Sequence, residues 1–200
     1  MNRRKKFDRD EAIAILMEEM WELGYEACTV NSMSEKLGIT RSSFYNAFGT
    51  KEKLFCEILD IYKISISGKE MFKTNNYRTV LSTITERMFK ICRYQEKDMA
   101  YRGCLAANSI QEIVNKHNEI EPVLKKFFTE NIHHFEKILG IAIKRGELED
   151  CDVRIVALSL QNLIIGLSEM SKIFRKKGEL WSVCQHNLRA LGLYEEFESD

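Results

Sequence analysis

Apolar side chains recur every three or four positions along almost the whole 200-residue chain, which is the period of an amphipathic α-helix. The first such stretch, residues 10–26, places Ile13, Leu16 and Met20 on one face and closes at Gly24. No stretch keeps the two-residue alternation that marks a half-buried strand. The pattern therefore predicts an all-α protein.

Three short helices leading into a long one are predicted in the first third of the chain. Thr29 can cap a second helix that stops at Gly38, and Thr40 can cap a third that ends at Gly49. Thr50 can cap the long fourth helix. The third helix is expected over residues 41–47, and further helices at about residues 77–95, 103–115, 119–145, 152–175 and 179–191.

The third predicted helix has two different faces. Phe44, Ala47 and Phe48 are expected to point inward. The other face carries Arg41, Ser42, Ser43, Tyr45 and Asn46. A helix of about seven residues is only about 10 Å long and is not stable alone, so its neighbours must hold it. We therefore expect the polar face to be presented outward rather than used for packing.

The residue types on that face suit duplex DNA. Small hydroxyl side chains let a helix enter the major groove, arginine can bond guanine or phosphate, and asparagine can pair with adenine. The preceding helix and the turn at Gly38 match a helix-turn-helix, in which the second helix lies in the groove. The simpler alternative is a small helical subdomain with a solvated polar face, as in a helical adaptor that does not bind DNA.

Charge supports DNA binding only locally. Lys plus Arg and Asp plus Glu are both 30, so the formal net charge is zero and gives no argument for a polyanionic partner. Residues 1–10, however, hold a cationic arm. The arm contains Arg3, Arg4, Lys5, Lys6 and Arg9 against only Asp8 and Asp10. We expect this arm, and Lys51 at the start of the fourth helix, to reach phosphates.

The stretch TVNSMSEKLGITRSSFYNAFGTKEKLF, residues 29–55, resembles the N-terminal signature of the TetR/AcrR family of transcriptional regulators. The resemblance includes the G-I-T turn, the F-Y pair and the K-E-K-L run, and it covers about the first 60 residues. Two positions depart from the pattern. Gly49 stands where many members have proline, and Ala47 where an aromatic residue is common.

The resemblance implies a helix-turn-helix DNA-binding domain over residues 1–55 and a helical ligand-binding and dimerisation domain over residues 56–200. It implies a homodimer through the last two long helices that binds a near-palindromic double-stranded operator as a repressor. A small-molecule effector of unknown identity would release it. The DNA contacts that the resemblance implies are Thr29, Thr40, Arg41, Ser42, Ser43, Tyr45, Asn46 and Lys51. To these we add Arg3, Arg4, Lys5 and Lys6 of the cationic arm because of their charge.

The larger domain offers candidate ligand contacts and a candidate interface. Aromatic and soft apolar residues with a few polar groups suit a ligand pocket, although the same residues suit a plain core. The candidates are Phe89, Cys92, Cys104, Asn108, Phe128 and Phe135. Residues 153–174 are apolar on more than one face, which indicates burial on two sides, one of them against a partner subunit.

Cys104 raises an alternative trigger. It follows Gly103 at a predicted helix start and lies beside Arg102, and both features favour the thiolate form. A regulator that responds to electrophiles or oxidants through Cys104 is therefore an alternative to one that binds its effector reversibly.

Several function classes are not indicated. The six cysteines show no C-x-x-C spacing, so neither a zinc site nor a secreted disulfide framework is expected. His133 and His134 are adjacent on a helix and cannot share a metal, so they are expected to be surface residues. We expect no catalytic residues, no cofactor and no metal, because no nucleotide or hydrolase motif occurs. We also expect a cytoplasmic protein, because no apolar run approaches the roughly 18 residues that span a bilayer.

Overall fold

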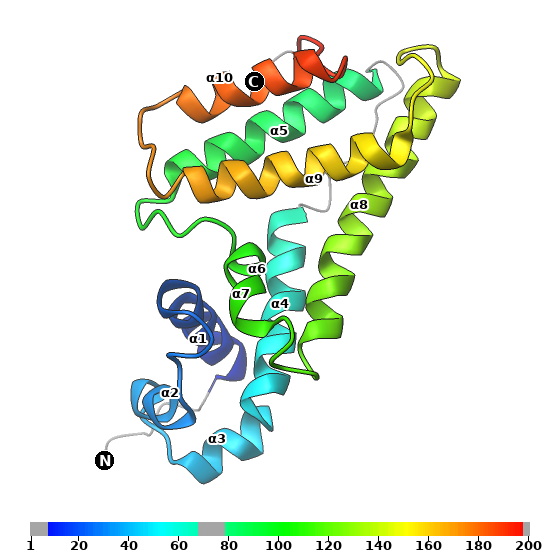
Figure 1. Cartoon of the computed structure of the whole chain (residues 1–200). Helices are drawn as coiled ribbons and strands as arrows, with labels where there is room; N and C mark the ends of the chain where they lie inside the picture. The colour runs from blue at the N-terminus through cyan, green and yellow to red at the C-terminus, as the bar shows by residue number, and fades with distance from the viewer. Residues whose placement is uncertain (1–7, 68–78, 198–200) are drawn as a thin grey trace. The chain divides into compact units, whose positions relative to one another are not determined.

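The computed structural model describes residues 8–67 and 79–197, and every regular element within them is an α-helix (Figure 1). The elements are α1 Arg9–Leu23, α2 Val30–Leu37, α3 Arg41–Phe48, α4 Lys51–Ser67, α5 Val80–Lys97, α6 Leu105–Asn108, α7 Ile110–Ile113, α8 Glu121–Lys144, α9 Val153–Met170 and α10 Glu179–Ala190. The all-α prediction is confirmed, and most of the helix boundaries agree with prediction to within three residues.

Two of the later helices differ from prediction. The single helix expected over residues 103–115 is two short turns, α6 and α7, which are separated at Ser109. The Ser109 hydroxyl donates to the Leu105 carbonyl (2.8 Å). Helix α9 ends at Met170 rather than near residue 175, and the Ser171 hydroxyl donates to the Ser168 carbonyl (2.7 Å). In both places a serine hydroxyl bonds a carbonyl of the preceding turn.

The chain forms two compact units. We call Met1–Ile66 with Leu105–Lys125 the N-terminal unit, and Ser67–Cys104 with Lys126–Asp200 the C-terminal unit. The segment 105–125 therefore packs with helices that precede it by many residues. This long-range contact lies outside what helical periodicity can predict.

Aromatic side chains fill the core of the N-terminal unit. The rings of Trp21 and Tyr62 meet edge to face at 5.1 Å, and those of Tyr25 and Phe55 lie 4.9 Å apart. Phe44 of α3 is fully buried with them. Burying such a side chain contributes roughly 1.5–3 kcal/mol, so this core can hold the short helices that are unstable alone.

Segment 105–125 is fastened to the turn between α1 and α2. The Glu112 carboxylate accepts the Glu26 backbone N–H (2.8 Å), and His117 Nε2 lies 2.6 Å from Glu26 Oε1. The His117 ring also meets Tyr25 edge to face at 4.8 Å. The hydrogen bond with His117 lowers the pKa of the Glu26 carboxyl. These contacts join residues about ninety positions apart in the chain.

Arg9 has an internal role rather than the phosphate contact expected of the cationic arm. Its guanidinium forms two 2.7 Å hydrogen bonds with the Glu57 carboxylate of α4, and Nε donates to the Ala47 carbonyl of α3 (3.0 Å). It also lies 5.6 Å from the Phe48 ring centroid. The bidentate geometry gives this pair directional strength that a lysine would not supply. Arg9 therefore ties α1 to α3 and α4.

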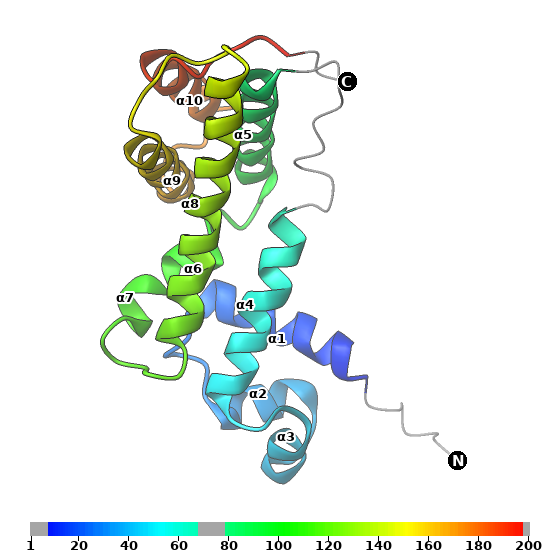
Figure 2. The same cartoon turned by 90° about the vertical axis from the view of Figure 1, so that its right-hand side faces the viewer.

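The C-terminal unit is built on α5, α9 and α10, which contact one another, as Figures 1 and 2 show. Their buried faces meet in one hydrophobic cluster that includes Ile84, Met88, Leu160 and Leu188, with Phe135 of α8. The buried side chains of α5 are spaced as helical periodicity predicts. Helix α9 is different, because Ile155 and Leu158 are exposed on its other side.

Helix α9 corrects the expectation that no apolar run approaches membrane-spanning length. The 18 residues Val153–Met170 are long and apolar enough to cross a bilayer by length and composition alone. Within the C-terminal unit one side of this helix contributes Ala157, Leu160 and Leu167 to the core. A helix that packs on one side and leaves apolar groups on the other also suits a protein interface.

Candidate DNA-binding site

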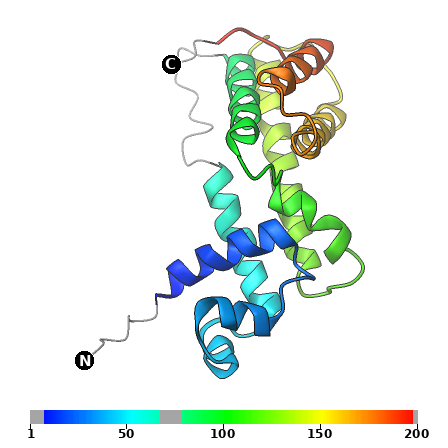
Figure 3. The same ribbon diagram turned by 90° about the vertical axis from the view of Figure 1, so that its left-hand side faces the viewer.

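The α2–turn–α3 element has the geometry that the sequence predicts. Helix α2 ends at Gly38, which has φ 65° and ψ 32°, and the Gly38 N–H donates to the carbonyls of Ser34 and Glu35. This left-handed conformation is easy for glycine and costly for residues with a Cβ. Thr40 then caps α3 by accepting the Ser43 N–H (3.1 Å). Helices α2 and α3 pack as a pair (Figure 3).

Helix α3 separates its buried and exposed faces as predicted, except that Ala47, which was expected to point inward, is only half-buried. Phe44 is 0% exposed and Phe48 5%, whereas Tyr45 is 46% exposed. The polar side chains are exposed on the same helix, namely those of Arg41, Ser42, Ser43 and Asn46. The helix therefore presents an arginine, two serines, an asparagine and a tyrosine to its surroundings and is held from behind by phenylalanines.

Thr29 and Thr40 are exposed at the starts of α2 and α3 and serve as caps. Thr29 Oγ1 accepts the Ser32 N–H (3.1 Å), and Ser32 Oγ accepts the Thr29 N–H (3.0 Å). This reciprocal capping box satisfies two backbone donors that the helix itself leaves open. The positive end of the helix dipole at these positions favours a nearby anion.

Lys51 lies over an aromatic ring of its own unit. Its Nζ is 3.9 Å from the centroid of the Tyr25 ring, and the Tyr25 hydroxyl donates to Glu52 Oε1 (3.3 Å). Burial, followed by the charge of Glu52, raises the pKa of the Tyr25 hydroxyl. Lys51 is half-buried in this arrangement.

The departure from the family pattern at position 49 has a backbone reason. Gly49 ends α3 with φ 72° and ψ −125°, and its N–H donates to the Tyr45 carbonyl (2.9 Å). Proline is locked near φ −65° and has no N–H, so it could neither adopt this conformation nor make this bond. Thr50 then accepts the Lys53 N–H (3.2 Å) and caps α4 as predicted.

The cationic arm cannot be placed. Arg3, Arg4, Lys5 and Lys6 lie outside the described residues. Their contact with phosphate therefore stays a prediction from charge alone.

The candidate ligand residues fall in several places. Phe89 meets Trp181 at 5.1 Å and Phe197 at 5.3 Å, while Cys92 and Phe135 are fully buried in the hydrophobic cluster of the C-terminal unit. The others are half-buried: Phe128 and Cys104 in the C-terminal unit and Asn108 in the N-terminal unit. Cys92 shares a hydrogen bond with Cys184, and this bond together with burial raises the pKa of the Cys92 thiol.

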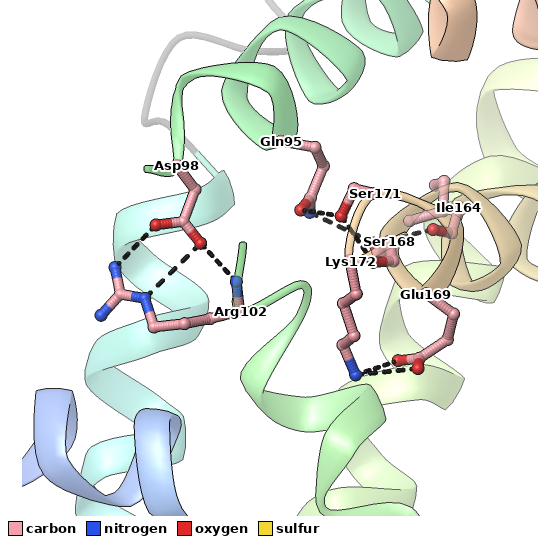
Figure 4. Close-up of polar contacts among 8 residues, drawn as sticks. All are labelled: Gln95, Asp98, Arg102, Ile164, Ser168, Glu169, Ser171 and Lys172. Atoms are coloured by element: carbon pink, nitrogen blue, oxygen red, sulfur yellow. Dashed lines mark hydrogen bonds and ion pairs between the residues drawn. The ribbon is translucent and has the colours of Figure 1, made fainter. Parts of the chain in front are cut away.

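The surroundings of Cys104 weaken the argument for a thiolate there. The Arg102 guanidinium is paired with Asp98 (3.2 Å), and the Asp98 carboxylate also accepts the Arg102 backbone N–H (2.7 Å; Figure 4). The positive charge expected to stabilise a thiolate is thus compensated by a carboxylate. Helix α6, which begins at Leu105, is a single turn rather than the long helix expected. Its dipole is correspondingly small.

A buried cation in the C-terminal unit was missed by the sequence reasoning. Arg87 of α5 is 7% exposed, its Nη2 donates to Asn131 Oδ1 (3.0 Å), and its guanidinium lies 5.0 Å from the Phe135 ring centroid. Asn131 in turn donates to Gln161 of α9. Burial lowers the pKa of Arg87 to about 10, so it remains charged at neutral pH. Arg87 lies three positions after the buried Ile84, and this helical spacing was a signal available in the sequence.

His134 lies near this cluster and differs from its exposed neighbour His133. Burial, followed by the charges of Arg87 and Lys137, lowers the pKa of His134 to about 4 from its usual 6.5. The folded protein therefore prefers the neutral imidazole. The stability that this preference contributes is present above pH 6.5 and is lost as the pH falls toward 4.

We expect His134→Gln to reduce the acid sensitivity of folding. Between pH 7 and pH 4 the wild-type free energy of unfolding should fall more than that of the variant, by on the order of 1 kcal/mol, because His134 is only half-buried and solvent screens its charge. Urea unfolding at the two pH values measures this difference. His133→Gln is the matched control, because His133 is exposed. An identical fall in wild type and His134→Gln would contradict the assignment.

Comparisons with known proteins agree with this geometry. Residues 13–58 match the family described as "Bacterial regulatory proteins, tetR family", and residues 81–187 match "Tetracyclin repressor-like, C-terminal domain". The chain is 29% identical over 169 residues to the HTH-type transcriptional repressor ComR of Escherichia coli K12, covering 83% of this chain and 80% of ComR. It is 25% identical over 179 residues to the uncharacterized HTH-type transcriptional regulator YezE of Bacillus subtilis 168, covering 86% and 90%.

A solved structure extends the comparison to a complex with DNA. It contains a cysteine-substituted form of the TetR family transcriptional regulator CifR with 26-bp double-strand operator DNA. That chain is 26% identical to this one, with a TM-score of 0.83, and the match covers 95% of this chain and 100% of the CifR chain. The two family matches, the helix-turn-helix geometry and these relatives have one common explanation: this chain belongs to the TetR family of DNA-binding transcriptional regulators, which are not enzymes.

Proposed function

We propose that this protein is a ligand-responsive repressor that binds a near-palindromic operator as a homodimer and is released by a small molecule. The observation that carries the proposal is that the two faces of α3 differ. Phe44 and Phe48 are buried, whereas the other face of the helix is exposed and carries Arg41, Ser42, Ser43, Tyr45 and Asn46. A helix held by its apolar face and polar on its other face can enter the major groove without unfolding any part of the domain.

We assign the DNA contacts by their place on the helices. Arg41, Ser42, Ser43, Tyr45 and Asn46 would face base edges and nearby phosphates, because they form the exposed face of α3. The remaining contacts would go to the sugar–phosphate backbone, from Thr29, Thr40, Lys51 and the arm residues Arg3, Arg4, Lys5 and Lys6. Residues 1–55 would thus carry DNA binding, and residues 56–200 ligand binding and dimerisation.

A homodimer through α9 and α10 is supported by their exposed apolar side chains. Ile155, Leu158 and Met170 of α9 and Val183 of α10 are each more than a third exposed. Dimeric helix-turn-helix proteins read half-sites about 34–36 Å apart, or 10–10.5 bp centre to centre. The 26-bp operator in the CifR structure has room for two such half-sites.

Repression and release are proposed from the relatives and from linkage. ComR is described as a repressor. An effector would bind the C-terminal unit and favour a conformation in which the two recognition helices are wrongly spaced, because only differential affinity for two states can shift their equilibrium. We propose Phe89, Cys92, Cys104, Asn108, Phe128 and Phe135 as candidate contacts and add the buried cation Arg87. We propose that the protein acts in the cytoplasm.

Selection of bound sequences from random duplexes tests the function. We expect one enriched near-palindromic site, and an affinity for it that falls steeply as salt is raised, because phosphate contacts release counterions. A metabolite panel added to the complex should then contain a compound that releases the duplex. Indifference to every duplex at low ionic strength would reject DNA binding and would favour a helical adaptor.

A parallel treatment separates the two proposed triggers. An electrophile that releases wild-type protein but not Cys104→Ser would favour the covalent trigger at Cys104. Release by a reversible ligand in both forms favours the pocket.

A further inference from the structure

A groove runs between α9 and α10 of the C-terminal unit. Its cavity volume is about 570 Å³. Apolar side chains from both helices line it, among them Leu163, Met170, Val183 and Ala190, together with Phe174, which follows α9. Among the described residues that line it, Glu179 is the one with an ionisable side chain.

One exposed face of α9 follows helical spacing, and three of its residues, Asn162, Gly166 and Met170, line the groove. Ile155, Leu158, Asn162, Gly166 and Met170 are all exposed and lie three or four positions apart. They form a stripe about four turns long that carries no charge. A solvated helix face normally carries charged residues, so this stripe is typical of a surface that another protein covers.

Gly166 lies in this stripe, and its own chain gives no reason for a glycine. A Cβ added to Gly166 would meet nothing within 4 Å, apart from the helix's own backbone and adjacent residues. The position is helical, and it is not among the glycines with positive φ. Glycine is the least favourable helix residue after proline, and alanine the most favourable. Within one subunit, alanine at position 166 would therefore fit and would favour the helix.

We propose that Gly166 is the point at which the backbones of two α9 helices cross in the homodimer, and that the open space above it is filled by the partner's α9. This inference rests on the proposed homodimer and names its closest contact. Small residues let two helices approach closely, as they do where helices cross in tightly packed pairs. The proposed contact with the partner's α9 thus explains why position 166 is a glycine, for which the single chain gives no reason.

A second copy of this chain is the occupant that the groove fits best. A two-fold interface requires one self-complementary patch, in which each subunit offers both the recess and the side chains that fill a recess. The groove provides the recess, and Ile173 and Phe174, which are 73% and 43% exposed, lie immediately after α9. The lining holds one carboxylate, that of Glu179, and is otherwise uncharged. The groove therefore has no charged patch that would select a strongly cationic or anionic partner.

Sedimentation of the full-length protein tests the crossing point. We expect Gly166→Ala to weaken self-association at least about tenfold and Gly166→Leu at least about a hundredfold, because each added atom separates the helices. The helical circular dichroism of Gly166→Ala should be equal to or greater than that of wild type. Gly140→Ala is the matched control, since Gly140 in α8 is also helical and a Cβ there also meets nothing within 4 Å. It should leave the dissociation constant unchanged.

Two outcomes separate this inference from the proposal on which it rests. If wild type is a dimer and both Gly166 variants keep its dissociation constant, the crossing point is rejected and the homodimer stands. If wild type stays monomeric at high concentration, the homodimer and the crossing point are both rejected. Should Gly166→Leu lose helical signal, the alanine variant alone decides.

Discussion

Alanine at Phe44 is expected to destabilise the N-terminal unit by about 3–5 kcal/mol, the usual cost of removing a fully buried phenylalanine. The Phe44 ring is 0% exposed and lies 5.0 Å from the ring of Phe48. This ring joins α3 to the rest of its unit. A helix of eight residues is not stable by itself and depends on that packing. Since folded proteins are stable by only about 5–15 kcal/mol, this change removes a large share of the total.

Urea unfolding followed by circular dichroism measures this loss, and duplex binding should be lost with it. Tyr45→Ala is the control at the neighbouring position, because Tyr45 is 46% exposed on the other face of the same helix. Its effect on the free energy of unfolding should be about 1 kcal/mol or less. Equal destabilisation by the two changes would contradict the assignment of buried and exposed faces.

The double change Arg41→Ala with Tyr45→Ala is expected to lower affinity for the selected duplex by about thirtyfold or more at nearly unchanged stability. A lost base or phosphate contact from one such residue costs about 1–3 kcal/mol, so two lost contacts exceed about 2 kcal/mol. Binding measured over a range of salt concentrations should also show a shallower slope, because a phosphate contact made by the arginine would be gone.

Tyr94→Ala is the matched control for this experiment. Tyr94 is 47% exposed, nearly the same as Tyr45, but belongs to the C-terminal unit. It should leave duplex affinity unchanged. A stable double variant that binds the selected duplex as wild type does would reject the exposed face of α3 as the DNA contact.

The recognition helix was predictable because its signals are local. Thr40, Gly38 and Gly49 act on their own backbone neighbours, and these capping and turn residues delimit α3 to within one residue. The inward places of Phe44 and Phe48 follow from helical spacing alone. The exposure of Arg41, Tyr45 and Asn46 is then the complement of that burial.

Contacts between distant segments were not predictable in the same way. Arg9 looked like part of a cationic arm, but Glu57, its partner, is 48 positions away. Cys92 was predicted as a candidate ligand contact, yet it is fully buried in the same hydrophobic cluster as the distant Cys184. Two apolar surfaces of similar pattern can pair in many ways, and periodicity does not say which pairing buries the most surface.

By itself, the sequence determined the helical class, the positions of the first four helices and the side chains that α3 exposes, because each depends on bonds and spacings within a few residues. Only the tertiary structure decided that residues 105–125 pack with the N-terminal unit, that Arg87 is buried, and that Gly166 opens into an apolar groove. Those facts depend on which surfaces meet. That choice is made by the packing of the whole chain rather than by any one segment.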